Sequence, residues 1–164
     1  MTDHDPFNEP EQAHARAREL MKEPLLWDCV DEEAPFGSDE GHDAYYEFRD
    51  WRKRHPKSPL TECLGWIMDG RLDDYDETLC SDARVRRDVE QPDQAFLAES
   101  YDPFTLDATV IATGLGQLLD EGRIDAEAKP YIRVAIQRQL HPLMLTSDNR
   151  KQILYAIARV VDQA

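Results

Sequence analysis

Residues 103–122 hold the most constraining pattern in the chain, a predicted helix whose apolar side chains cover much of its circumference. Asp102 is a good N-cap, Pro103 suits the first helical position, and Gly122 supplies a stop. A helix that is apolar on most sides must be enclosed by other elements, because its surface cannot face water. The sequence therefore predicts that this helix is central and the most buried. Its apolar residues are Leu106, Val110, Ile111, Leu115, Leu118 and Leu119.

Further helices are predicted on both sides of this segment, from amphipathic spacing and from local start and stop signals. They cover residues 10–24, 38–54, 58–70, 130–140 and 148–161. Ser38 and Ser147 are expected N-caps, and Gly114 and Gly116 indicate that another backbone packs closely on the central helix. Strand alternation is otherwise absent, although residues 25–30 also fit a short strand or a buried extended piece. We expect a mostly α fold, an irregular bundle of about six helices.

The chain of 164 residues has the size of one domain, large enough to bury a core without metal ions or disulfides. We therefore expect residues 1–164 to form a single domain. Residues 71–100 fit a helical pattern least well, because acidic residues crowd their first part and residues 79–89 are at best a weakly amphipathic helix. This stretch is predicted to be a mobile acidic connection between two halves of the domain.

Negative charge is the largest departure from average composition. The chain has 34 Asp and Glu against 19 Lys and Arg, for a formal net charge of −15. Residues 1–122 carry −18 of this charge and residues 123–164 carry +3. Such a field repels phosphate backbones and anionic lipids, so we expect no nucleic acid and no membrane among the partners. A basic protein is the favoured partner class.

Compartment signals favour the cytoplasm. Residues 1–7 are acidic and lack a basic stretch followed by an apolar core, so no secretory signal is predicted. The longest uncharged run, residues 108–119, is shorter than the roughly 20 residues that a membrane-spanning helix needs. The cysteines Cys29, Cys63 and Cys80 are odd in number and form no close pair, which fits thiols in a reducing compartment.

The densest candidate site lies between Glu23 and Glu47, where nine carboxylates and no Lys or Arg alternate with aromatic residues. One interpretation is a docking surface, on which aromatic rings bury area and carboxylates steer a basic partner. The other is a solvated loop and helix start, with Trp27 and Phe36 in the core. The candidate partner-binding residues are Asp28, Asp31, Glu32, Glu33, Asp39, Glu40, Asp43 and Tyr46.

Asp39, His42 and Asp43 lie one turn apart on a predicted helix and are weak candidates for metal ligands. No second His lies within helical reach and no Cys accompanies them, which favours a role in capping and solvation. The sequence contains none of three further patterns: that of a calcium loop, that of a protease nucleophile or that of a phosphate-binding loop. We therefore expect no cofactor, and the sequence leans against an enzyme without excluding one.

Four stretches near the amino terminus resemble a group of bacterial proteins of the YfeS/MolR-like kind. The stretches are His14-Ala-Arg-Ala-Arg-Glu-Leu-Met-Lys, Leu26-Trp-Asp, Pro35-Phe-Gly-Ser-Asp-Glu-Gly-His-Asp and Phe48-Arg-Asp-Trp. The resemblance covers about residues 14–70 and implies a bacterial cytosolic protein, without assigning an activity. It also singles out a structural unit, in which Pro35 to Gly37 would turn the chain and Phe36 would be pinned in the core.

These observations favour a non-enzymatic acidic module that binds a basic protein, for example an immunity protein that masks a toxin. The reason is the −18 charge of residues 1–122, which exceeds what solubility requires. Two alternatives stay open. One is a metal-dependent or hydrolytic enzyme that uses Asp39, His42 and Asp43, and the other is a regulatory homodimer that pairs through an apolar helix face.

Overall fold

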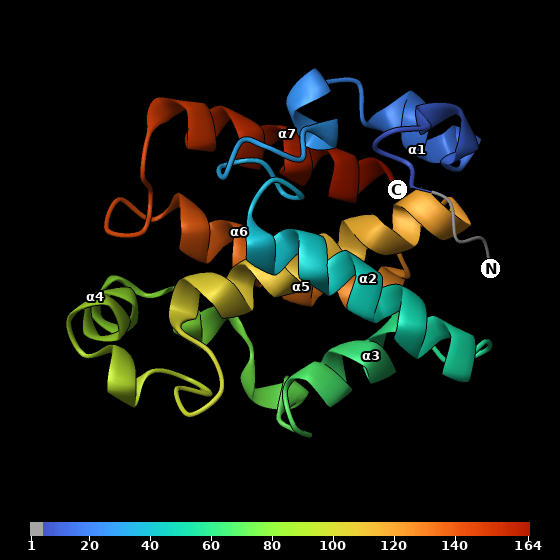
Figure 1. Ribbon diagram of the computed structural model, residues 1–164. Helices are drawn as coiled ribbons and strands as arrows, with labels where there is room; N and C mark the ends of the chain where they lie inside the picture. The colour runs from blue at the N-terminus through green and yellow to red at the C-terminus, as the bar shows by residue number, and fades with distance from the viewer. Residues whose placement is uncertain (1–4) are drawn as a thin grey trace.

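The computed structural model describes residues 5–164, which form seven α-helices joined by short 3-10 turns and contain no β-strand (Figure 1). The prediction of a mostly α fold is confirmed, with one helix more than expected. Residues 25–30 do not form a strand, because Pro24–Trp27 is a 3-10 turn. The helices are α1 (Ala15–Leu20), α2 (Asp39–Arg54), α3 (Leu60–Ile67), α4 (Asp82–Glu90), α5 (Pro103–Glu121), α6 (Lys129–Leu140) and α7 (Asp148–Gln163).

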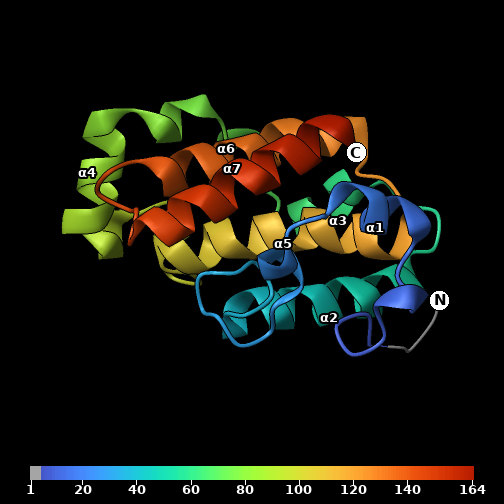
Figure 2. The ribbon, with the colours of Figure 1, turned by 90° about the horizontal axis from the view of Figure 1, so that it is seen from above.

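Helix α5 lies at the centre of the molecule, as predicted for residues 103–122. Helix α2 packs along one side of α5 and α6 along the other, while α7 packs on α6 (Figures 1 and 2). Every residue of α5 from Leu106 to Leu119 is buried. Among residues 5–164, no helix combines the length and the apolarity that crossing a bilayer requires.

Local capping signals act where the sequence predicts them. The Ser38 hydroxyl accepts a hydrogen bond from the backbone N–H of Gly41 at the start of α2, at 3.1 Å. Asp102 and Ser147 cap α5 and α7 in the same way, at 2.8 and 3.0 Å. Each bond satisfies a backbone donor that the first turn of a helix leaves unpaired. Gly122 ends α5 with a φ of +78°, a conformation that side chains disfavour.

The two glycines inside α5 admit large side chains from both neighbouring helices. A Cβ at Gly114 would lie 2.4 Å from the Ile132 side chain of α6, and one at Gly116 would lie 2.8 Å from the Tyr45 ring of α2. The expected close approach at these glycines is therefore made by side chains and not by a backbone. It lets α2 and α6 settle deeply on α5 from opposite sides.

Residues 71–100 fold against the bundle through short helical pieces. The 3-10 turns η3 (Leu72–Asp74) and η4 (Glu77–Cys80) lead into α4. Buried side chains occur throughout the stretch: Tyr75, Leu79, Val85, Phe96 and Leu97. Residues 71–100, predicted to be a mobile connection, are thus anchored by their own buried side chains. The spacing of these side chains is too irregular to predict a helix from the sequence.

Arg138 on α6 joins carboxylates from two other helices in the interior. Its guanidinium lies 3.2 Å from Asp107 of α5 and 3.0 Å from Asp88 of α4, and neither carboxylate has an exposed side chain. Asp107 also accepts hydrogen bonds from the Tyr75 hydroxyl at 2.6 Å and from Gln139 at 2.9 Å. Burial raises the pKa of Asp107, and the charge of Arg138 opposes that rise. The network ties α4 and the η3–η4 segment to α5 and α6.

Candidate functional site: an acidic face along helix α2

The chain reaches α2 through a tight turn that leaves no space for side chains at two glycines. A Cβ at Gly37 would lie 1.8 Å from the carbonyl oxygen of Asp31, and one at Gly41 would lie 1.9 Å from that of Pro35. Phe36 is fully buried, as predicted. The Pro-Phe-Gly-Ser-Asp-Glu-Gly pattern therefore has a structural reason, because it fixes the path of the acidic loop against the start of α2.

The inner face of α2 carries apolar side chains and arginines that bond inward. Arg49 donates to Asp120 at 2.9 Å, and both side chains are 4% exposed. Arg52 donates to Glu121 at 2.7 Å. These two pairs join α2 to the last turn of α5, and their charges cancel within the fold. The apolar residues on this face are Tyr45, Phe48 and Trp51.

The outer face of α2 carries four carboxylates at helical spacing, here termed the acidic stripe: Glu40, Asp43, Glu47 and Asp50. Among residues 5–164, none of the four forms an ion pair with Lys, Arg or His. Like charges three or four residues apart on a helix repel, at a cost of about 0.2–0.5 kcal/mol per pair. The acidic stripe therefore adds repulsion between neighbouring carboxylates of α2.

A groove of about 210 Å³, here termed the α2 groove, runs beside the acidic stripe. Glu40, Asp43 and Glu47 form one wall, and Tyr101 and Thr105 lie on the segment that leads into α5 and on its first turn. Burial and the nearby charge of Glu47 raise the pKa of Tyr101, which keeps its hydroxyl neutral. Carboxylates beside an aromatic ring suit an ammonium or guanidinium group.

The predicted partner-binding residues divide into those on or near α2 and those hydrogen-bonded within the acidic loop. Glu40 and Asp43 line the α2 groove, and Asp39 and Glu32 are exposed nearby in the sequence. Tyr46 is half-buried; its ring lies 5.0 Å from that of His42 and 5.7 Å from the Arg49 guanidinium.

Hydrogen bonds accepted by Asp28, Asp31 and Glu33 hold the acidic loop in place. Asp28 accepts hydrogen bonds from the backbone N–H groups of Val30 and Asp31, which lower its pKa. Asp31 accepts from the backbone N–H of Glu33 at 2.9 Å. The Glu33 carboxylate accepts from three side chains at the start of α7, those of Thr146, Ser147 and Asn149. Those bonds lower the pKa of Glu33. These hydrogen bonds come from neutral groups, so they fix the path of the loop while the three carboxylates keep their charges.

The weak metal candidates Asp39, His42 and Asp43 are not assembled into a binding group. Within residues 5–164, no three side chains of His, Cys, Asp or Glu are placed to hold an ion. The His42 ring packs 6.1 Å from the ring of Phe7 and 5.0 Å from that of Tyr46. The three residues share helix α2 as predicted, but the His42 imidazole joins an aromatic cluster.

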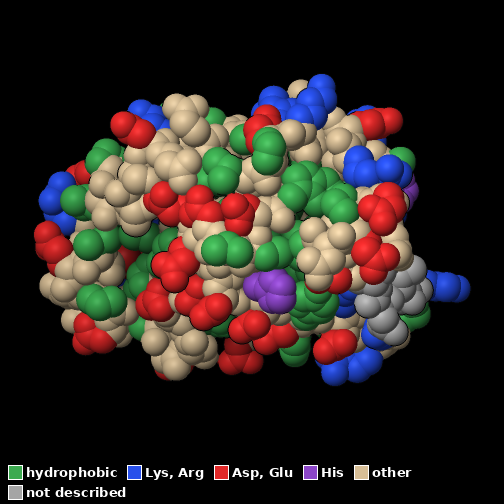
Figure 3. Space-filling model, turned by 45° about the horizontal axis from the view of Figure 1, so that its top comes forward, with side chains coloured by type: hydrophobic (Ala, Val, Ile, Leu, Met, Phe, Trp, Pro, Cys, Tyr) green, Lys and Arg blue, Asp and Glu red, His purple; other side chains and the backbone are tan. Residues whose placement is uncertain are grey.

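Three residues of this face are not among the predicted partner-binding residues: Glu47, Asp50 and Tyr101. Glu47 and Asp50 follow Asp43 at spacings of four and seven, so the helical period already contained the signal for them. Tyr101 had no such signal, because it comes from a segment distant in sequence. Figure 3 shows Asp and Glu side chains gathered in the middle of one face of the molecule, with Lys and Arg mainly near its edges.

No family model, curated protein or solved structure matches this chain. The resemblance of residues 14–70 to YfeS/MolR-like proteins stays a prediction, and the function must be inferred from the site.

Proposed function

We propose that this protein is a non-enzymatic acidic module that binds a basic protein through the acidic stripe and the α2 groove. The observation that carries the proposal is the acidic stripe, four carboxylates on one helix face that no cation of residues 5–164 neutralises. Exposed carboxylates of this kind steer a cationic partner and raise its association rate. The Tyr101 ring adds contact area beside them.

The placement of the nearest arginines strengthens this proposal. Arg49 and Arg52 lie on the same helix as the acidic stripe, yet both bond to carboxylates of α5 on the inner face. The repulsion along the acidic stripe does not stabilise the fold, and a cationic partner bound to the stripe would remove that repulsion. In a bacterial cytoplasm, an immunity-like protein that masks the basic surface of a toxin would use such a face.

The test compares the natural chain with a variant that neutralises the acidic stripe, Glu40→Gln/Asp43→Asn/Glu47→Gln/Asp50→Asn. Partners are cross-linked to the purified protein in a lysate of the source organism at low salt and identified by mass spectrometry. We expect a basic protein that is recovered by the natural chain and lost with the stripe variant.

A second variant controls for overall charge. Glu90→Gln/Asp93→Asn/Glu99→Gln/Glu127→Gln changes the net charge by the same amount at four exposed positions outside α2. Recovery of the basic protein should persist with this control. Equal loss in both variants would mean that only net charge matters, and recovery of acidic proteins alone would overturn the proposal.

A further inference from the structure

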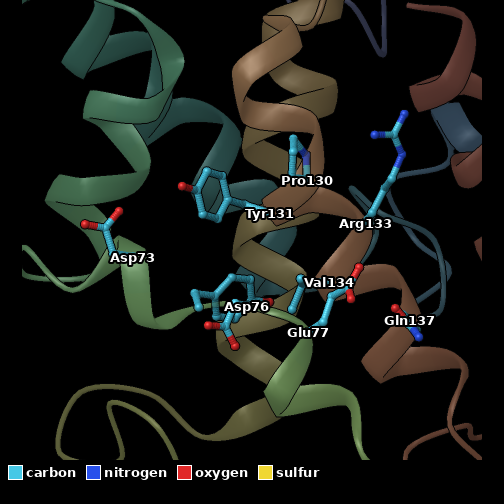
Figure 4. Close-up of a pocket in the computed structure, with 9 residues that line it drawn as sticks. Asp73, Asp76, Glu77, Pro130, Tyr131, Arg133, Val134 and Gln137 are labelled. Atoms are coloured by element: carbon cyan, nitrogen blue, oxygen red, sulfur yellow. The ribbon is translucent and has the colours of Figure 1, made fainter.

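A second groove lies beside α6, which packs on the side of α5 opposite to α2 (Figures 2 and 4). Its volume is about 380 Å³. One wall is the η3–η4 segment with Asp73, Asp76 and Glu77, and the other wall is α6 with Tyr131 and Val134. This space, here termed the α6 groove, combines an aromatic and aliphatic wall with an acidic rim.

The acidic rim of the α6 groove is not neutralised from within. Among residues 5–164, Asp73, Asp76 and Glu77 form no ion pair. The one cation on the lining, Arg133, bonds to Asp162 of α7 at 3.1 Å, and its side chain extends away from Asp73 and Asp76 in Figure 4. Hydrogen bonds from Thr78 lower the pKa of Asp76, so this carboxylate stays charged in mildly acidic solution.

The floor and the aromatic wall of the α6 groove are already formed. The hydroxyl of the buried Tyr75 donates to Asp107, which is itself held by Arg138, so the Tyr75 ring is fixed in the floor. On the opposite wall, the Tyr131 ring extends from α6 toward Asp73 (Figure 4). A flat cation that enters between Tyr131 and the acidic rim contacts an aromatic ring on one side and carboxylates on the other.

We propose that the α6 groove binds an arginine side chain presented by an exposed segment of the basic partner. A guanidinium is planar, stacks on a tyrosine ring and bonds a carboxylate with two parallel N–H donors, whereas an ammonium does neither as well. The inference rests on the proposed function for the class of partner, and it adds a separate contact site on another side of the molecule. Two sites on one partner raise the overall affinity beyond that of either.

The test uses the full chain and a blocked pentapeptide, acetyl-Gly-Ser-Arg-Ser-Gly-amide, titrated by NMR. A matched peptide with citrulline in place of arginine keeps the shape of the side chain and removes its charge. We expect the tightest binding at residues 72–77 and 130–137, where shift changes saturate first, with an affinity for the arginine peptide about fivefold to tenfold higher than for the citrulline peptide.

Variants then assign the binding to the α6 groove. Asp73→Asn/Asp76→Asn and Tyr131→Ala should each lower the affinity about fivefold or more, while Tyr131→Phe keeps the ring and should bind as the natural chain does. Glu90→Gln/Asp93→Asn is the charge-matched control. Equal affinity for both peptides, no shift changes at residues 72–77 and 130–137, or unchanged binding by the groove variants would overturn the inference.

The stripe variant separates this inference from the proposed function. At the α6 groove it should bind the pentapeptide as the natural chain does, while losing the basic protein in the cross-linking experiment. A failure of the α6 groove leaves that cross-linking result intact, and a failure of the acidic stripe leaves the peptide titration intact.

Discussion

The two faces of helix α2 differ in how their charged side chains are paired. On the inner face, Arg49 and Asp120 pair at 2.9 Å with 4% of each side chain exposed, and the pair joins two helices. On the outer face, the acidic stripe has no cation partner among residues 5–164. A net charge of −15 by itself therefore does not indicate where a binding face lies. A binding face emerges only after the arginines that bond inward have been set apart from those that face solvent.

The largest expected effect comes from breaking a buried pair on the inner face. Arg49→Met leaves the Asp120 carboxylate buried without its cation, and we expect a loss of about 3–5 kcal/mol in the free energy of unfolding, measured with urea. The neighbouring Asp50→Asn, on the outer face, should change it by less than about 0.5 kcal/mol. Similar effects from both substitutions would remove the distinction between the two faces.

Trp51→Ala tests the apolar part of the inner face. Trp51 is 3% exposed, and its ring stacks on that of His55 at 4.9 Å. Its removal leaves a cavity between α2 and its neighbours and should cost about 3–5 kcal/mol in the same urea experiment. A loss under about 1 kcal/mol would contradict the burial of this side chain.

Gly41→Ala tests the turn that carries the chain into α2. The added methyl group meets the carbonyl oxygen of Pro35, so we expect a loss of about 1–3 kcal/mol. Gly65→Ala on α3 is the matched control, because nothing lies within 4 Å of its Cβ position. Since alanine favours a helix interior, this control should stabilise the protein by about 0.5–1 kcal/mol. Equal responses would show that the turn accommodates a side chain.

Neutralising the acidic stripe should stabilise the free protein while it removes binding. The substitutions remove the repulsion within three like-charge pairs along α2, which should add about 0.6–1.5 kcal/mol to the free energy of unfolding at low salt. Raising the salt concentration should stabilise the natural chain more than the stripe variant, because ions screen the same repulsion. A natural chain whose thermal stability does not rise with salt would contradict this account of the surface.

The smallest effect concerns the loop acid Glu33, which accepts hydrogen bonds from the start of α7. The pKa of Glu33 lies below its usual value of 4.5 in the folded protein, so its contribution to stability is present above pH 4.5 and is lost as the pH falls through the lowered value. Glu33→Gln removes that contribution. The difference in unfolding free energy between the two proteins should therefore shrink as the solution is acidified from neutral pH. A difference that stays constant would exclude the charge of Glu33 as its source.

The sequence predicted the features that local chemistry decides. Ser38, Asp102 and Ser147 cap helices because each bond is made within three residues, and Gly122 stops α5 for an equally local reason. The sequence predicts helix α4 only weakly, because a charged residue, Asp88, takes one of its buried positions.

The candidate site was predictable only in part, because its membership depends on contacts between distant segments. Glu40 and Asp43 were found from the density of charge along the chain. Glu33 looked equally free in the sequence, yet it is bonded to α7 more than a hundred residues later. Arg49 likewise finds its partner Asp120 across 71 residues, and no periodicity reveals such a pair.

The enclosure of α5 also constrains how the molecule can be built during synthesis. One side of α5 is covered by residues that precede it in the chain and the other by α6, which follows it. A nascent chain that has emerged only as far as Gly122 leaves part of an uncharged stretch, residues 108–119, facing water. We therefore expect stable folding to wait until α6 has left the ribosome, with apolar surface of the kind that chaperones bind exposed until then.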